Sequence, residues 1–91
     1  MNLNLKYPEE IAKDIADAEK TKRKKRKLTQ EELSARAGIS LGSLRRFEQT
    51  GEISFVSLLK IAAVLDETDK FTELFTSREY ISIQEVIDET N

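Results

Sequence analysis

The sequence predicts an all-α protein, a five-helix bundle followed by a short C-terminal extension. Its 91 residues suffice for one domain, which we place at residues 1–76, with an acidic extension at residues 77–91. One proline and three glycines leave the chain rich in helix formers and poor in strand-turn residues. Apolar residues recur at helical spacing in successive segments, which favours helices throughout.

The first helix is predicted from about Tyr7 to Lys25. Pro8 suits the first helical position, because its missing N–H would have no partner there, and two glutamates follow in the first turn. The apolar residues expected to face the core are Ile11, Ile15 and Ala18.

The second and third helices are bounded by capping residues. Thr29 and Glu32 form a capping box that opens the second helix, and Gly38 can end it in the left-handed conformation. Ser40 caps the third helix, predicted from Leu41 to about Gln49. The expected apolar contacts of this pair come from Leu33, Ala37, Ile39, Leu44 and Phe47.

Two further helices are predicted before the extension. Ser54 caps a helix that reaches Asp66, with an apolar stripe at Phe55, Leu58, Leu59, Ala62 and Leu65. A short fifth helix is expected to bury Phe71, Leu74 and Phe75. In the extension, residues 82–85 could open a final helical turn, whereas Tyr80, Ile81 and Ile83 could equally begin a strand.

The charge is distributed unevenly along the chain. Residues 1–65 carry 13 Lys and Arg against 9 Asp and Glu, whereas residues 66–91 carry 2 against 8. Seven of the eight residues 20–27 are basic. Cations suit a helix C-terminus, but so dense a run repels itself, which favours contact with phosphate. The net charge of −2 does not exclude such contact, because DNA responds to the local field.

Several functional classes are disfavoured by composition. The chain has no cysteine and no histidine, so it lacks thiolate metal ligands, disulfides and the commonest general base. Acid pairs at residues 9–10 and 31–32 fall in first helical turns, where the helix dipole explains them. We therefore expect no enzyme activity, no metal and no cofactor. No apolar run could span a membrane or serve as a signal peptide, and we expect a cytoplasmic protein.

The spacing within residues 30–48 predicts the function. Small Ser34 lets the next helix cross closely, Gly38 permits a tight turn, and apolar Leu44 fixes the second helix to the core. The outer face of that second helix is left free. This is the arrangement with which a helix-turn-helix places one helix in the DNA major groove.

These residues resemble a known family. The residues at positions 28–33, 37–40, 44, 47–48, 51 and 57–62 are similar to the phage-repressor/Cro type of helix-turn-helix, often called the XRE type. The resemblance covers about residues 9–75. It implies a lambda-repressor-like bundle that binds double-stranded DNA sequence-specifically as a dimer and usually represses transcription.

The resemblance also implies roles for individual residues. Gln30 matches a helix-start position that grips a phosphate, and Glu48 matches a structural glutamate. The candidate base-reading residues are Leu41, Gly42, Ser43, Arg45 and Arg46. Leu41 and Gly42 depart from the polar residues usual there, which moves polar contacts to the other three. The candidate phosphate contacts are Gln30, Ser40, Thr50, Arg23, Lys24, Lys25, Arg26 and Lys27.

Three functional hypotheses remain open at this stage. The first is a dimeric repressor. The second is an antitoxin that neutralises a HipA-like kinase toxin and autoregulates its operon, because residues 43–54 resemble that subgroup. The third is a helical adaptor that has lost DNA binding. The apolar material outside the predicted four-helix core predicts a homodimer interface at Phe71, Phe75, Tyr80, Ile81 and Ile83.

Overall fold

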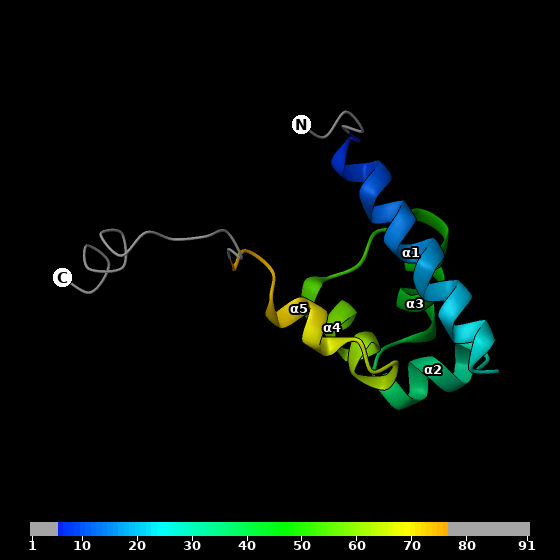
Figure 1. Cartoon of the computed structure of the whole chain (residues 1–91). Helices are drawn as coiled ribbons and strands as arrows, with labels where there is room; N and C mark the ends of the chain where they lie inside the picture. The colour runs from blue at the N-terminus through cyan, green and yellow to red at the C-terminus, as the bar shows by residue number, and fades with distance from the viewer. Residues whose placement is uncertain (1–5, 77–91) are drawn as a thin grey trace, which may run out of the picture.

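The computed structural model describes residues 6–76, and every regular element in that range is a helix (Figure 1). This confirms the predicted all-α architecture. The expectations for residues 80–85 lie outside the described residues. The helices are α1 (Pro8–Lys25), α2 (Gln30–Ala37), α3 (Leu41–Thr50), α4 (Phe55–Val64) and α5 (Thr68–Thr72).

The predicted caps form as hydrogen bonds. The Thr29 hydroxyl accepts from the Glu32 amide at 3.0 Å, and the Glu32 carboxylate accepts from the Thr29 amide at 2.9 Å. The hydroxyls of Ser40 and Ser54 each accept from the amide three residues later, at 3.0 and 3.1 Å. Each cap satisfies an amide that has no partner within its helix, and so fixes where the helix begins.

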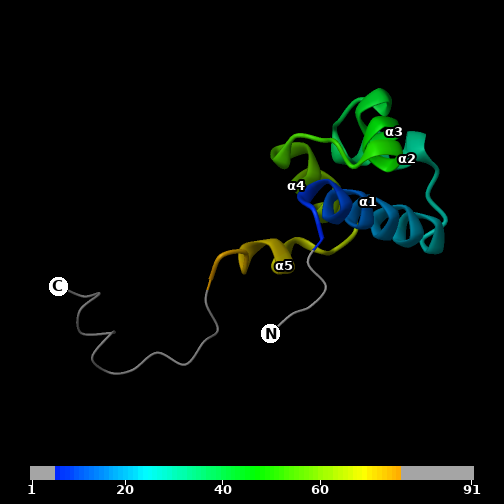
Figure 2. The same ribbon diagram turned by 90° about the horizontal axis from the view of Figure 1, so that it is seen from above.

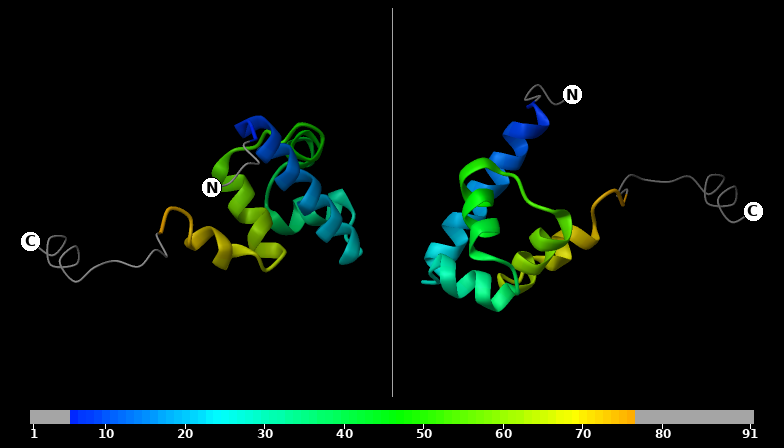
Figure 3. Two further views of the ribbon diagram at one scale, coloured as in Figure 1. Left: turned by 45° about the horizontal axis from the view of Figure 1, so that its top comes forward. Right: turned by 180° about the vertical axis from the view of Figure 1, so that it is seen from behind.

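Two sets of packing contacts organise the bundle. Helix α3 packs on both α1 and α2, and α4 packs on α2 and α5. Viewed from above, α2 and α3 lie on one side of α1 and α5 lies on the other (Figure 2). The views in Figure 3 show α3 alongside α1 and the α5 end of the described chain apart from them. The buried core consists of Ala16, Leu28, Leu33, Leu44, Phe47, Ile61 and Leu65.

The expected core face of α1 is wrong. Ile11 and Ile15 are 47% and 41% exposed, and Ala18 is exposed as well. The buried face instead carries Ala16, Glu19 and Arg23. The cause is a close approach between α1 and the end of α3. A Cβ placed on Gly51 would stand 2.8 Å from the backbone of Ala12 and Lys13, so this side of α1 is covered by α3.

The expected burial along α4 and α5 also needs correction. Phe55 is exposed, and Ile61 is buried in its place. Helix α5 buries none of its residues: Phe71 is half-buried, Leu74 is exposed and Phe75 is fully exposed. The reason is that α5 has only five residues, too few to close over the neighbouring helices. Between residues 6 and 76, no helix is both long and apolar enough to span a membrane.

Candidate functional site

The turn between α2 and α3 has the geometry that the spacing predicted. Gly38 has φ 72°, a left-handed conformation that glycine adopts without the strain of a side chain. The Ile39 amide donates to the Ser34 carbonyl at 3.0 Å, and the Ser34 side chain is buried where the helices meet. Leu44 and Phe47 are buried and fix the inner face of α3.

The outer face of α3 presents the candidate base-reading residues at its surface. Gly42, Arg45 and Arg46 are exposed, and Leu41 and Ser43 are half-buried. The Ser40 hydroxyl donates to that of Ser43 at 2.8 Å, so the two hydroxyls hold each other at the N-terminus of α3. All five residues are therefore at least partly accessible, as is Ser40.

Arg46 is held by an ion pair at the C-terminal end of α3. Its guanidinium donates to the Glu52 carboxylate, and both side chains are exposed. Thr50 connects the same two residues, because its hydroxyl donates to the Arg46 carbonyl at 2.7 Å and accepts from the Glu52 amide at 3.1 Å. The candidate phosphate contact Thr50 thus orders the backbone next to a candidate base-reading arginine.

Gln30 links α2 to α3. Its side-chain amide donates to the Glu48 carboxylate at 3.0 Å, and its amide oxygen accepts from Arg45 Nε at 3.4 Å. A candidate phosphate contact and a candidate base-reading residue are therefore held together through one amide group.

Among the candidate phosphate contacts, Arg23 alone is buried. It is only 6% exposed, and it donates to both oxygens of Glu48 at 2.8 and 2.9 Å and to the Leu28 carbonyl at 2.9 Å. A bidentate pair of this kind is short, directional and strong. Arg23 therefore joins α1 to α3, and its guanidinium is not accessible to a phosphate in this structure.

Glu19 lies beside this pair. It is 8% exposed, and neither of its carboxylate oxygens accepts a hydrogen bond. Burial raises the pKa of Glu19 to about 8, and the neighbouring Glu48 adds to that rise. Burial would also raise the pKa of Glu48, but hydrogen bonds from Arg23, Glu19 and Gln30 outweigh it and lower that pKa. Glu19 therefore carries the proton at neutral pH, and Glu48 is ionised.

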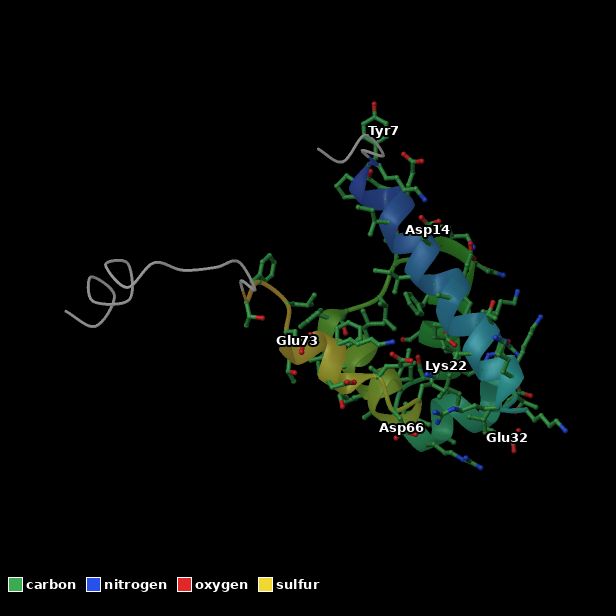
Figure 4. All side chains as sticks on the ribbon, in the orientation of Figure 1. Tyr7, Asp14, Lys22, Glu32, Asp66 and Glu73 are labelled. Carbon is green, nitrogen blue, oxygen red and sulfur yellow. The ribbon has the colours of Figure 1, made fainter. Side chains whose placement is uncertain are left out.

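The basic run divides into paired and unpaired cations. Arg26 pairs with Asp66 at 2.9 Å, and Lys22 pairs with Glu67. Hydrogen bonds from Lys22 and Lys70 lower the pKa of Glu67 to about 2. Figure 4 shows Lys22 on α1 and Asp66 in the loop after α4. Four exposed lysines of the run have no ion pair within residues 6–76 and remain accessible, namely Lys20, Lys24, Lys25 and Lys27, and the last three are candidate phosphate contacts.

Sequence reasoning missed the buried cluster of Glu19, Arg23 and Glu48. A signal was present, because Ala16, Glu19 and Arg23 recur at helical spacing and mark one face of α1. The apolar stripe on the neighbouring face was the stronger pattern. The Arg46–Glu52 pair had no comparable signal, since Glu52 follows the turn at Gly51. Of the candidate dimer residues, Phe71 lies in α5 and Phe75 lies three residues after its end, and Tyr80, Ile81 and Ile83 lie outside the described residues.

Comparison with known proteins gives a family match. A family model described as helix-turn-helix matches residues 20–70, which covers α2 to α4 and parts of α1 and α5. No curated protein matches the chain. The match does not extend to the antitoxin subgroup.

Proposed function

The chain belongs to the XRE-type helix-turn-helix family of DNA-binding transcription regulators, and from that premise we propose that it is a repressor that binds a palindromic operator as a homodimer. The observation that carries this proposal is that the outer face of α3 is exposed. The turn at Gly38 and buried Leu44 hold the inner side of α3 in the bundle. The family is normally non-enzymatic.

We assign the outer face of α3 to base recognition. Arg45 and Arg46 supply the long polar side chains that bind base edges, Ser43 a short one, and Leu41 an apolar contact suited to a thymine methyl group. Gly42 lets the backbone approach the groove floor closely. The Arg46–Glu52 pair breaks when the guanidinium turns to a base, at little cost because both groups are exposed.

We assign the surrounding cations and polar groups to phosphate contact. The accessible candidates are Lys24, Lys25 and Lys27, and Arg26 joins them if it exchanges Asp66 for a phosphate. Gln30, Ser40 and Thr50 lie at the ends of α2 and α3, where an amide or hydroxyl can bind the DNA backbone while the helix sits in the groove. Arg23 is left out because it is buried against Glu48.

A homodimer follows from the limited reach of one reading helix. A single helix-turn-helix makes few base contacts, so proteins of this kind pair across half-sites about one helical turn apart. We place the pairing surface at Phe71 and Phe75, with Tyr80, Ile81 and Ile83 from the extension. Phe71 belongs to α5, which lies on the side of α1 away from α3, and Phe75 follows that helix in the chain (Figure 2).

DNA binding itself is tested with the intergenic DNA upstream of the gene, by gel shift and by fluorescence anisotropy over 50–200 mM salt. We expect the affinity to fall steeply with salt, because each phosphate contact releases counterions. Absence of binding would favour the adaptor hypothesis. Binding that is insensitive to salt would contradict the phosphate assignments.

The two classes of contact are separated by a matched pair of variants. Arg46→Ala should relax sequence preference at one base pair by about 1–3 kcal/mol. Neutralising Lys24, Lys25 and Lys27 to Gln should weaken binding to all sequences about equally and reduce the salt slope. Competition binding against single-base operator variants measures both effects. A uniform loss from Arg46→Ala would reverse its assignment.

The antitoxin hypothesis makes a different prediction about genetic context and partners. It requires a kinase-like toxin frame in the same operon and a stable complex between the two products. Co-expression with the neighbouring gene, followed by size-exclusion chromatography, distinguishes it from a repressor that acts alone.

A further inference from the structure

An open apolar groove lies between α1, α4 and α5. Its volume is about 380 Å³, and no residue of α2 or α3 lines it. Its walls include Ile15 and Ala18 from α1, Leu58 and Leu65 at the two ends of α4, and Phe71 and Leu74 at α5. Exposed Ile11 and Ile15 extend the apolar surface along α1. Soluble monomers rarely leave large contiguous apolar surfaces uncovered, so this surface calls for a partner.

Two exposed aromatic residues adjoin the groove, and Phe75 is the more exposed of them. The other, Phe55, is 56% exposed and packs edge-on against the lining residue Phe71, with ring centroids 6.3 Å apart. Phe75 directly follows Leu74, a lining residue, and is fully exposed. Its φ of 64° lies in the left-handed region, which non-glycine residues adopt rarely and at an energetic cost. A bound partner that buries the ring would offset that cost. A fully exposed ring therefore directly follows the groove wall along the chain.

We propose that this groove receives Phe75 of a second copy, so that two copies exchange their Phe75 rings across a two-fold axis. The inference rests on the proposed homodimer and specifies its contact. A two-fold interface uses the same patch on both copies, and the patch must therefore be complementary to itself. A surface that carries both an apolar projection and an adjacent apolar groove meets this requirement.

The charges around the groove are compatible with a like copy. Lys22 and Lys70 both pair with Glu67 at the groove edge, so one of these two positive charges is already neutralised within each copy. The location is compatible with DNA binding as well. Helix α5 lies across α1 from α3, and none of the proposed DNA-contact residues lines the groove (Figure 2).

Three variants test the contact in the full chain. Phe75→Glu removes the projection, and Ala18→Trp fills the groove from its α1 wall. Both side chains are exposed, so neither change disturbs the buried core. Thr72→Glu is the matched control, because it adds the same charge to an exposed position of α5 that does not line the groove. Circular dichroism verifies that all three remain helical.

We expect the first two variants each to raise the dimer dissociation constant about 30-fold or more in analytical ultracentrifugation, as loss of a central aromatic anchor does. Thr72→Glu should leave it within about threefold of the unmodified chain, as expected outside such an anchor. A mixture of Phe75→Glu and Ala18→Trp should form heterodimers detectable by native mass spectrometry. One copy still carries the ring and the other still carries an open groove, so one of the two contacts is restored.

Other results overturn the inference in distinguishable ways. If the chain dimerises and Phe75→Glu leaves that unchanged, the homodimer stands and the contact is wrong. If the chain is monomeric and still binds its operator by gel shift, the inference and the homodimer fail while DNA binding stands. A mixture without heterodimers also contradicts the exchange.

Discussion

Helix α1 reverses the usual pattern of an amphipathic helix, because it buries charged side chains and exposes apolar ones. The face against α3 buries the charged side chain of Arg23, whereas the neighbouring face exposes Ile11 and Ile15. Buried Glu19 lies between the two faces and also lines the groove. On the first face, Arg23 makes three hydrogen bonds, two of them to Glu48. On the second, the exposed apolar side chains continue into the groove wall.

The difference shows how one helix can meet two requirements. Hydrogen bonds to Glu48 are directional, so they fix the position of α3 relative to α1, and α3 carries the proposed base-reading residues. Apolar contacts are not directional, and they suit the surface that we propose associates with a second copy. We infer that the buried charges orient the reading helix and that the exposed apolar residues serve assembly.

The largest expected effect is on the charged face. Arg23→Ala leaves the Glu48 carboxylate buried without its partner, and we expect a loss of about 3–5 kcal/mol in the free energy of unfolding. Ile15→Ala is the matched variant on the other face, and because Ile15 is 41% exposed we expect a loss of about 1 kcal/mol. Urea denaturation at pH 7, below the dimer dissociation constant, measures both.

A third variant refines this test. Arg23→Lys keeps the charge but cannot make the bidentate pair, so its loss should lie between those of the other two. Equal losses from Arg23→Ala and Ile15→Ala would break the comparison, because the two faces would then contribute alike to the stability of the monomer.

The next effect concerns the close approach of α1 and α3. Gly51 has φ 83° and no room for a Cβ beside Ala12 and Lys13, whereas Gly38 has φ 72° and open space around it. Gly38→Ala should cost about 1–2 kcal/mol from backbone strain alone. Gly51→Ala should cost a further 1–3 kcal/mol, approximately, because the helices must separate. Thermal unfolding compares the two, and equal losses would argue against tight contact at Gly51.

The sequence predicted the elements of this fold well because their signals are local. Thr29, Gly38 and Ser40 determine the ends of α2 and α3 through bonds to residues within a few positions, so capping patterns suffice to locate them. The α2–α3 turn and the exposed face of α3 followed from the same local rules.

The orientation of α1 could not be predicted because it depends on a distant residue. Within its basic run, Arg23 has the character of a phosphate contact. It is buried instead because Glu48 of α3 approaches it and accepts two of its hydrogen bonds. Glu48 is 25 positions away, and no local pattern links the two. The exposure of Ile15 has the same origin, since α3 covers the opposite side of α1. Burial of Phe75 was expected from its apolar character, which does not distinguish a core from an interface.

The most gradual expected effect is a pH dependence of the free energy of unfolding, which arises from Glu19 on α1. The pKa of Glu19 is raised from 4.5 to about 8, so between these pH values the folded chain holds a proton that the unfolded chain releases. Stability from this group is therefore complete below pH 4.5 and is lost as the pH rises through 8. We expect the free energy of unfolding to fall by roughly 1 kcal/mol per pH unit across this range.

Glu19→Gln isolates this contribution. The amide keeps the size of the side chain and can donate to Glu48 without releasing a proton, so the slope between pH 5 and pH 8 should largely disappear. The chain has no histidine or cysteine, whose ordinary pKa values lie nearest this range, so little else changes charge there. Below pH 4.5 the lowered pKa values of Glu48 and Glu67 act in the opposite sense, because protonating those carboxylates removes their ion pairs. Urea denaturation at half-unit pH steps measures the slope, and an unchanged slope in Glu19→Gln would show that the buried face of α1 does not hold this proton.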